Sequence, residues 1–213
     1  MIDFLYKNFS ISFQLFFLRI GFNKNNYNNF NDLNFKQNDF INYKIIKYYV
    51  LKNNFVNNTN IQDIHTFNFL FFYQKLGGKK GIELSKKNIF LWFKKFKYYK
   101  NFPWNTEHAS KRFINLLYNY DFICSISDKK EISRINKILN FHINRISLEM
   151  GLKKTDSISS SEILALVLIE CCKNTLNSKI IKKIDYLINI QIDENSMHKS
   201  YNILEHAKFL NNL

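Results

Sequence analysis

The chain has 213 residues, of which 46% are apolar and 17% aromatic, with one proline and five glycines. This composition excludes a disordered chain and a turn-rich β-sandwich, because apolar residues are plentiful and helix-breaking residues are few. The net charge of +14 suggests a polyanionic partner. However, the lysines are dispersed and accompany Asn, Ile, Phe and Tyr, the residues that AT-rich codons specify. We therefore interpret the densest basic cluster, Lys94-Lys95-Phe96-Lys97, as the solvated face of a helix.

Residues 1–58 are predicted to be less regular than the rest. The apolar stretch at 4–20 predicts a helix, residues 21–36 an Asn-rich loop and residues 38–50 a second helix. No segment reaches the roughly 18 uncharged apolar residues of a membrane span. The N-terminal stretch also lacks the basic start and the cleavage site of a signal peptide. We expect no membrane span and a cytoplasmic location, with the periplasm as the alternative.

From residue 60 onwards the apolar residues recur at helical spacing. Helices are expected at 61–78, 82–99, from Asn105 or Thr106 to about 122, after Asp128 with Gly151 just past the end, after Ser159, from 178 to about 191 and from Ile203 onwards. Gly77-Gly78 and Pro103 supply stops, while Asp128–Glu131 and Ser159–Glu162 have the spacing of capping boxes. Such a series predicts one all-α domain over 1–213, whose regular part is residues 60–213. Periodicity leaves open a bundle, a helical solenoid and an α/α toroid.

Neither the cysteines nor the common catalytic motifs indicate a site. Cys124, Cys171 and Cys172 have no metal-ligand spacing and cannot form an even set of disulfides, so we expect free buried thiols. The sequence contains no HExxH, no CxxC, no phosphate-binding glycine loop and no serine nucleophile elbow. We expect no metal and no cofactor, and the hydrolase, kinase and zinc-protease classes lack support.

The histidines on apolar helix faces are interpreted as structural. His65 lies among phenylalanines and His142 among isoleucines, which is typical of core histidines. Trp104, His108 and Arg112 have a spacing that could line a cleft. From spacing alone, a packed tryptophan with a surface arginine is the favoured interpretation.

A polar segment after Ile192 interrupts the helices and carries His198, Ser200 and Tyr201, with His206 further along. A histidine beside a tyrosine can do general acid/base work, because the imidazole titrates near neutral pH. A capped turn with exposed polar side chains is the simpler interpretation and is slightly favoured on the residues alone.

Three segments follow one another at a spacing typical of one enzyme family. They read "IHTFNFLFFYQKLGG" (64–78), "WNTEHASKRFINLL" (104–117) and "INIQIDENSMHKSYNILEHAKFLNNL" (188–213). They resemble "LHSFxWLRDLRAxGG", "WxPDVxxRRLxxWL" and "xxxQILPDGGHxSRxPxxLLxxLxDLL" of the heparinase II/III-like family, the bacterial branch of alginate-lyase and heparinase-type polysaccharide lyases.

The match covers some motif positions and departs at others. Trp104 and Arg112 fall on the Trp and the second Arg of the second motif, and His198 falls on the His of the third. Several residues of the third motif are replaced. Asn195 stands in place of the Asp, Ser196 and Met197 in place of the two Gly, and Tyr201 in place of the Arg. Ile203 replaces the Pro, and Glu205 replaces the tyrosine of a later Tyr-His pair.

The resemblance implies an incomplete (α/α) toroid of antiparallel helical hairpins, with a toroid-like region at 60–213, and β-elimination on uronic-acid polysaccharides. Such a site neutralises the uronate carboxylate and supplies an acid and a base for removal of the C5 proton. By resemblance, Arg112 and Asn115 neutralise the carboxylate, His198 is the acid/base group and Trp104 is a sugar platform. His108 and Tyr201 are further candidates for substrate contact.

Family members continue into a β-sandwich domain, whereas this sequence stops at Leu213. We therefore expect a helical domain whose lyase activity is lost or requires a separate β-sandwich chain. Its expected partner is an acidic polysaccharide, and nucleic acid is not expected. The alternatives are a non-catalytic module that binds a polyanion, either glycan or nucleic acid, and a structural helical protein without a ligand.

Overall fold

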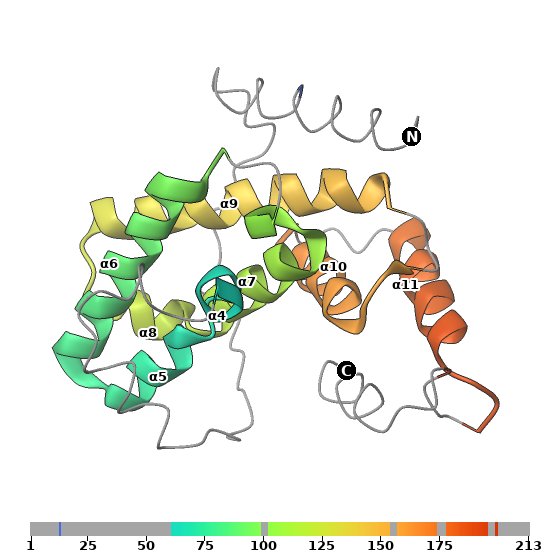
Figure 1. The fold of residues 1–213 in the computed structure, drawn as a ribbon, viewed down its shortest axis with the longest axis horizontal. Coiled ribbons are helices and arrows are strands. Elements are labelled where there is room, and N and C mark those ends of the chain that lie inside the picture. Colours follow the sequence, from blue (N-terminus) through green and yellow to red (C-terminus); the bar gives the residue numbers. More distant parts are fainter. Residues whose placement is uncertain are drawn as a thin grey trace.

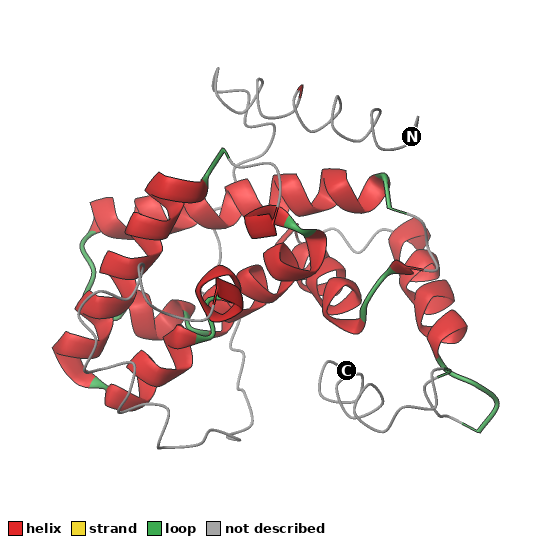
Figure 2. Cartoon of the chain, in the orientation of Figure 1, coloured by secondary structure: helices red, strands yellow, loops and turns green. Residues whose placement is uncertain are grey.

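The computed structural model describes residues 61–98, 102–153, 157–173 and 178–195, together with Phe13 and Lys199. Over these residues the chain is all-helical, with eight α-helices, one 3-10 turn and no strand (Figure 2). The elements are α4 (Ile61–Thr66), α5 (Phe69–Leu76), α6 (Gly78–Phe96), the 3-10 turn η1 (Phe102–Trp104), α7 (Thr106–Tyr118), α8 (Tyr120–Cys124), α9 (Lys129–Gly151), α10 (Ser160–Lys173) and α11 (Ser178–Gln191). The all-α prediction is confirmed for this part of the chain. The helices expected at 4–20, at 38–50 and from Ile203 lie outside the described residues.

Helix starts follow the capping residues that the sequence indicates. The Asn105 side chain accepts a hydrogen bond from the Glu107 backbone N–H at the start of α7, and Asp128 Oδ1 accepts one from Glu131 N–H at 2.7 Å at the start of α9. The Glu162 carboxylate accepts from the Ser159 N–H at 2.7 Å before α10. Each bond satisfies one of the backbone donors that a helix leaves without a partner in its first turn.

Two helices that the sequence predicts as continuous are broken. The helix expected at 61–78 ends at Thr66 and restarts at Phe69, because Phe67 adopts a left-handed backbone with φ 60°. This conformation is unfavourable for a non-glycine residue by about 1–2 kcal/mol. Complete burial of the Phe67 ring, in contact with Phe69 and Trp92, offsets that cost. The second break separates α7 from α8 at Asn119, whose Nδ2 donates to the Asn115 carbonyl oxygen.

Helix α7 is the central element. It packs against α4, η1, α9 and α10, with α5, α6 and α8 on one side and α10 and α11 on the other (Figure 1). Only Glu107, Lys111 and Tyr118 of α7 are not buried. Its buried residues include His108, Ser110, Arg112 and Asn115, so an unusual number of polar groups enter the core on one helix. One continuous hydrophobic cluster surrounds it, extending from Ile64 in α4 to Leu187 in α11.

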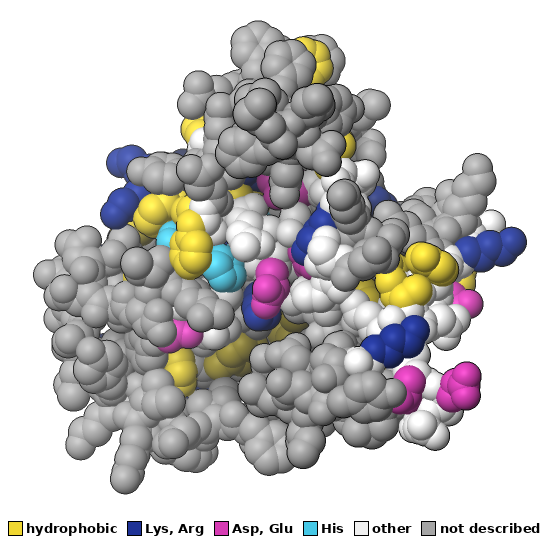
Figure 3. Space-filling view, turned by 45° about the vertical axis from the view of Figure 1, so that its right-hand side comes forward, with side chains coloured by type: hydrophobic (Ala, Val, Ile, Leu, Met, Phe, Trp, Pro, Cys, Tyr) yellow, Lys and Arg dark blue, Asp and Glu magenta, His cyan; other side chains and the backbone are white. Residues whose placement is uncertain are grey.

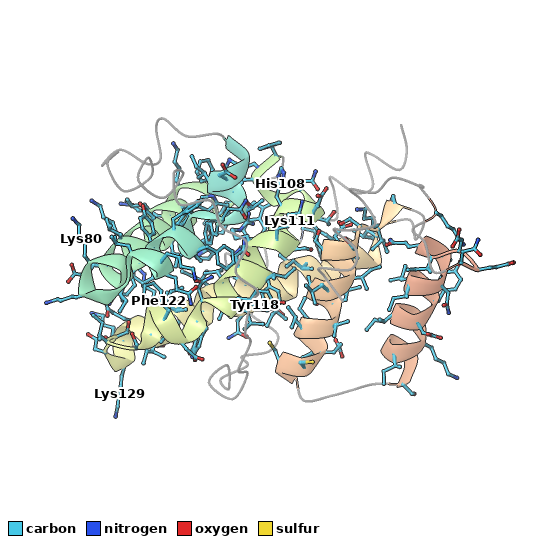
Figure 4. The ribbon with its side chains drawn as sticks, turned by 90° about the horizontal axis from the view of Figure 1, so that it is seen from below. Lys80, His108, Lys111, Tyr118, Phe122 and Lys129 are labelled. Atoms are coloured by element: carbon cyan, nitrogen blue, oxygen red, sulfur yellow. The ribbon has the colours of Figure 1, made fainter. Side chains whose placement is uncertain are left out.

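Helices α10 and α11 contact each other and run in opposite directions (Figure 4). The N-terminal end of α10, the C-terminal end of α11 and the His108–Lys111 end of α7 lie along the same edge of the molecule. Lys94 and Lys95 of α6 are exposed, as expected for a solvated face. Within the described segments, none of the helices combines the length and apolar character that a bilayer crossing requires.

Candidate functional site

Two residues of the second motif, Trp104 and Arg112, meet three residues outside the motifs in one buried group. We call it the arginine–tryptophan cluster: Trp92, Trp104, Arg112, His142 and Arg145. All five side chains are at most 1% exposed. The Arg112 guanidinium carbon lies 4.0 Å from the centre of the Trp92 ring and 4.4 Å from that of Trp104. The Arg145 guanidinium carbon lies 4.3 Å from the centre of the Trp104 ring. Two cations therefore contact one indole, an arrangement that electrostatic attraction to the ring favours.

Arg112 joins three elements through hydrogen bonds. Its Nε donates to His142 Nε2 on α9 at 2.7 Å, and its Nη1 donates to the carbonyl oxygens of Pro103 (2.9 Å) and His65. The His65 carbonyl belongs to the last turn of α4, where helix carbonyls lack an intrahelical partner. Arg112 therefore caps α4 and fixes η1 against it. The surface arginine expected from spacing alone is wrong, because Arg112 is 0% exposed.

Asn115 also caps the end of α4, at the carbonyl group that follows the one bound by Arg112. Its Nδ2 donates to the Thr66 carbonyl oxygen at 2.8 Å and to Asn68 Oδ1 at 3.0 Å. The left-handed Phe67 lies between these two acceptors, so Asn115 holds the chain where α4 turns into α5. Arg112 and Asn115 are one helical turn apart on α7, and together they satisfy consecutive carbonyl groups at the end of a short helix.

Two of the buried histidines, His65 and His142, act as hydrogen-bond acceptors. His142 accepts from Arg112, and its Nδ1 lies 2.8 Å from the Ile138 carbonyl oxygen. His65 Nδ1 accepts from the Trp92 indole N–H at 2.9 Å. Burial and, next, the Arg112 charge hold the pKa of His142 well below its usual range and lower the pKa of His65 to about 4. Both rings are therefore neutral at pH 7. Their burial and their hydrogen bonds within the core agree with the interpretation as structural histidines.

A second, more exposed group lies at the edge shared by α7, α10 and α11, and we call it the rim: Glu107, Lys111, Lys153, Glu162 and Gln191. Lys111 forms an ion pair with Glu107, and Lys153 Nζ contacts both Glu162 oxygens at 2.7 Å. Burial raises the pKa of Glu107, but the hydrogen bond from Lys111 and the charges of Lys111, His108 and Lys153 outweigh it and lower the pKa overall. The two ion pairs are thus close enough to influence each other.

Gln191 connects the third motif to the rim. Its Nε2 donates to the Ile158 carbonyl oxygen, next to Ser159, whose N–H donates to Glu162. The chain then turns, since Asn195 N–H donates to Asp193 Oδ1 at 3.0 Å and Lys199 N–H donates to the Gln191 carbonyl oxygen at 2.8 Å. The turn interpretation of this polar segment is confirmed for residues 193–195.

Of the predicted site residues, three lie together in the cluster region, one lies at the rim end of α7, and two lie outside the described residues. Trp104, Arg112 and Asn115 lie together but are closed to solvent, with exposed fractions of 1%, 0% and 7%. His108 is also buried, packs edge-on against Phe102 with ring centres 4.6 Å apart, and stands at the rim end of α7 (Figure 4). His198 and Tyr201 lie outside the described residues. Trp104 offers no open face to a sugar in this conformation.

Sequence reasoning missed the contribution of α9 to the cluster. Arg145 is 1% exposed, and its Nε donates to Glu149 Oε1 at 2.9 Å inside the core. The signal was present, because Arg145 and Glu149 are four residues apart and next to His142 and Ile146 of the predicted core face. Charged residues at this spacing can meet on one side of a helix. Removing one partner of a buried ion pair strongly destabilises the folded protein, because the other charge is left buried without compensation.

The described residues hold no cluster of side chains suited to a metal ion. Their cysteines are free thiols, and only Cys172 is fully buried. Burial raises the pKa of the Cys124 thiol to about 11 and that of Cys172 to about 12, so neither is a nucleophilic thiolate at neutral pH.

No protein-family model matches the chain, and neither a curated protein nor a solved structure is similar to it. The resemblance to the heparinase II/III-like family therefore depends on the three motifs and on what their residues do in the fold.

Proposed function

We propose that the chain is a helical domain of the heparinase II/III type that binds a uronic-acid-containing polysaccharide, with β-elimination as its ancestral chemistry. The observation that carries the proposal is the contact between the first two motifs. Arg112 donates to the carbonyl of His65 and Asn115 to that of Thr66, across 47 and 49 residues of sequence. These contacts give a physical reason for the two motifs to occur together and in this order.

The cluster supports a positioning role for these residues. Arg112 and Asn115 use their donors on backbone carbonyls, and Trp104 contacts two guanidinium groups. We propose that they set the geometry of α4, η1 and α7 and do not contact the uronate in this conformation. This replaces the direct neutralisation of the carboxylate that the resemblance implies for Arg112 and Asn115.

The polysaccharide is proposed to bind along the rim. Gln191 is held next to the Lys153–Glu162 pair by its bond to the Ile158 carbonyl oxygen, and it precedes His198 and Tyr201 in the sequence. Lys111 and Lys153 place ammonium donors at this edge, each paired with a carboxylate in this structure, and we propose that uronate carboxylates compete for them. His198 remains the proposed acid/base group, and Tyr201 and His108 the proposed substrate contacts. Elimination requires a base for the C5 proton and stabilisation of the charge that develops on the carboxylate.

We further propose that the antiparallel α10–α11 pair is one hairpin of an incomplete α/α toroid. A separate β-sandwich chain would then cover the rim. The direction of α10 and α11 supports this arrangement, since a toroid is built from antiparallel pairs of neighbouring helices.

Formation of unsaturated uronates tests the chemistry. The purified chain is incubated with uronate polymers and with a neutral glucan, and the absorbance of the new carbon–carbon double bond is followed. If the ancestral activity persists, absorbance rises only with a uronate polymer and is lost in His198→Ala, while the exposed-site control Lys94→Gln is unaffected. Product formation that survives in His198→Ala would contradict the role proposed for this histidine. The absence of both product and binding with every uronate polymer would contradict the function.

A row of lysines favours a second candidate, a non-catalytic polyanion-binding module. Lys80, Lys87 and Lys94 are spaced seven residues apart on α6, and all are exposed. Figure 3 shows basic side chains at separated places on one face, interspersed with acidic ones. Salt-dependent binding that Lys80→Gln, Lys87→Gln and Lys94→Gln together weaken, and that Lys111→Gln does not, would favour this candidate.

A further inference from the structure

The arginine–tryptophan cluster carries more positive charge and more hydrogen-bond donors than its described neighbours satisfy. Arg112 and Arg145 supply two guanidinium groups, which stay protonated in proteins. Glu149 is the one carboxylate that the described contacts give to either of them. His142 and His65 are neutral acceptors and compensate no charge.

The unsatisfied donors belong to the same two side chains. Among the described residues, Arg112 Nη2 and both Nη1 and Nη2 of Arg145 are buried without an acceptor. Both guanidinium groups lie over Trp104, at 4.4 and 4.3 Å from its ring centre. A buried polar group without a partner typically costs about 1–3 kcal/mol, and more when it is charged. The excess positive charge and the donors without acceptors therefore belong to the same two side chains beside Trp104.

We infer that the cluster binds a small monovalent anion beside Trp104, held by Nη groups of Arg145 and Arg112. One negative charge balances the two guanidiniums together with Glu149, and one compact acceptor can take several N–H groups at once. A halide ion and a formate-sized carboxylate share this chemistry. The site is separate from the rim, so the inference does not depend on the proposed function.

The two tryptophans of the chain make the test direct, because Trp92 and Trp104 both belong to the cluster. Tryptophan fluorescence is titrated with iodide in a gluconate buffer of constant ionic strength. An anion bound at the cluster gives saturable quenching that chloride or formate reverses by competition. Competition by chloride alone assigns a halide site, and competition by formate alone assigns a carboxylate site. Strictly linear quenching without competition would overturn the inference, since it reports random collisions only.

Stability gives a second readout. Replacing gluconate with the competing anion, at a hundred-fold excess over its Kd, raises the Tm of the wild type by about 5–10 °C. Arg145→Lys keeps a positive charge near Glu149 but removes the two Nη donors. The apparent affinity from saturable quenching therefore falls at least ten-fold, and the Tm shift at the same anion concentration decreases with it. Lys129→Gln, at the exposed start of α9, keeps both. Equal Tm values in chloride, formate and gluconate would assign water to these donors and would overturn the inference even if Arg145→Lys fails to fold.

Discussion

Arg112 Nε donates a hydrogen bond to Nε2 of His142 at 2.7 Å inside the core. The bond requires a neutral imidazole, because a protonated ring has no acceptor nitrogen. It links α7 to α9 next to both tryptophans, so the protonation state of one buried histidine is coupled to the packing of the cluster.

This coupling predicts acid-sensitive stability. Burial and Arg112 depress the pKa of His142 far below the value of about 6.5 that an unfolded histidine has, and they lower the pKa of His65 to about 4. Below pH 6.5 the unfolded state therefore binds more protons than the folded state, and the free energy of unfolding decreases as the pH falls towards 4. The slope is up to about 1.4 kcal/mol per pH unit for each histidine.

Denaturant unfolding between pH 4 and 8 measures that slope. His142→Gln keeps an acceptor for Arg112 but cannot be protonated, so the slope should decrease by about the contribution of one histidine. His108→Gln serves as the comparison at a histidine that does not accept from Arg112. An unchanged slope in His142→Gln would show that other groups cause the acid sensitivity.

Arg112 should be a large contributor to stability. Arg112→Met leaves the carbonyl groups of His65 and Pro103 without a donor, and we expect a loss on the order of 3 kcal/mol. Arg112→Lys should recover only part of this loss, because one ammonium group cannot reach acceptors on three elements. Lys111→Met is the matched control, since it removes a half-exposed ion pair and should cost less than about 1 kcal/mol. Equal losses at positions 111 and 112 in urea unfolding would refute the capping role.

Substitutions of Glu162, at the start of α10, should reduce stability in a graded way. This residue is 0% exposed and accepts from Lys153 and from the Ser159 backbone. Glu162→Gln retains an acceptor for Ser159 and should cost about 1 kcal/mol, whereas Glu162→Ala loses both bonds and should cost about 2 kcal/mol or more. Thermal unfolding of the two variants gives the order, and a reversed order would argue against the backbone contact.

Much of the helical pattern could be predicted because its signals are local. Asn105 and Asp128 cap the helices that the sequence assigns to them, and the helix at 178–191 has the predicted bounds. The break at Phe67 could not be predicted, because no glycine or proline marks it. Its left-handed backbone is stabilised by tertiary packing of the Phe67 ring.

The burial of the candidate site residues was likewise hidden from the sequence. An arginine at helical spacing resembles a surface residue, and the acceptors of Arg112 lie 9, 30 and 47 residues away. Only the folded chain shows that these acceptors are backbone carbonyls and a neutral histidine. The spacing of Arg145 and Glu149 was a local signal for the same cluster, and it was overlooked.

Calorimetric titration of the whole chain with a uronate oligosaccharide tests the central claim most directly, with a neutral oligosaccharide of equal length as the reference. The account predicts saturable heat with the uronate ligand alone, weakened several-fold by Lys111→Gln at the rim and unchanged by Lys94→Gln on α6. No heat with any uronate oligosaccharide, or equal heat with the neutral one, would contradict it.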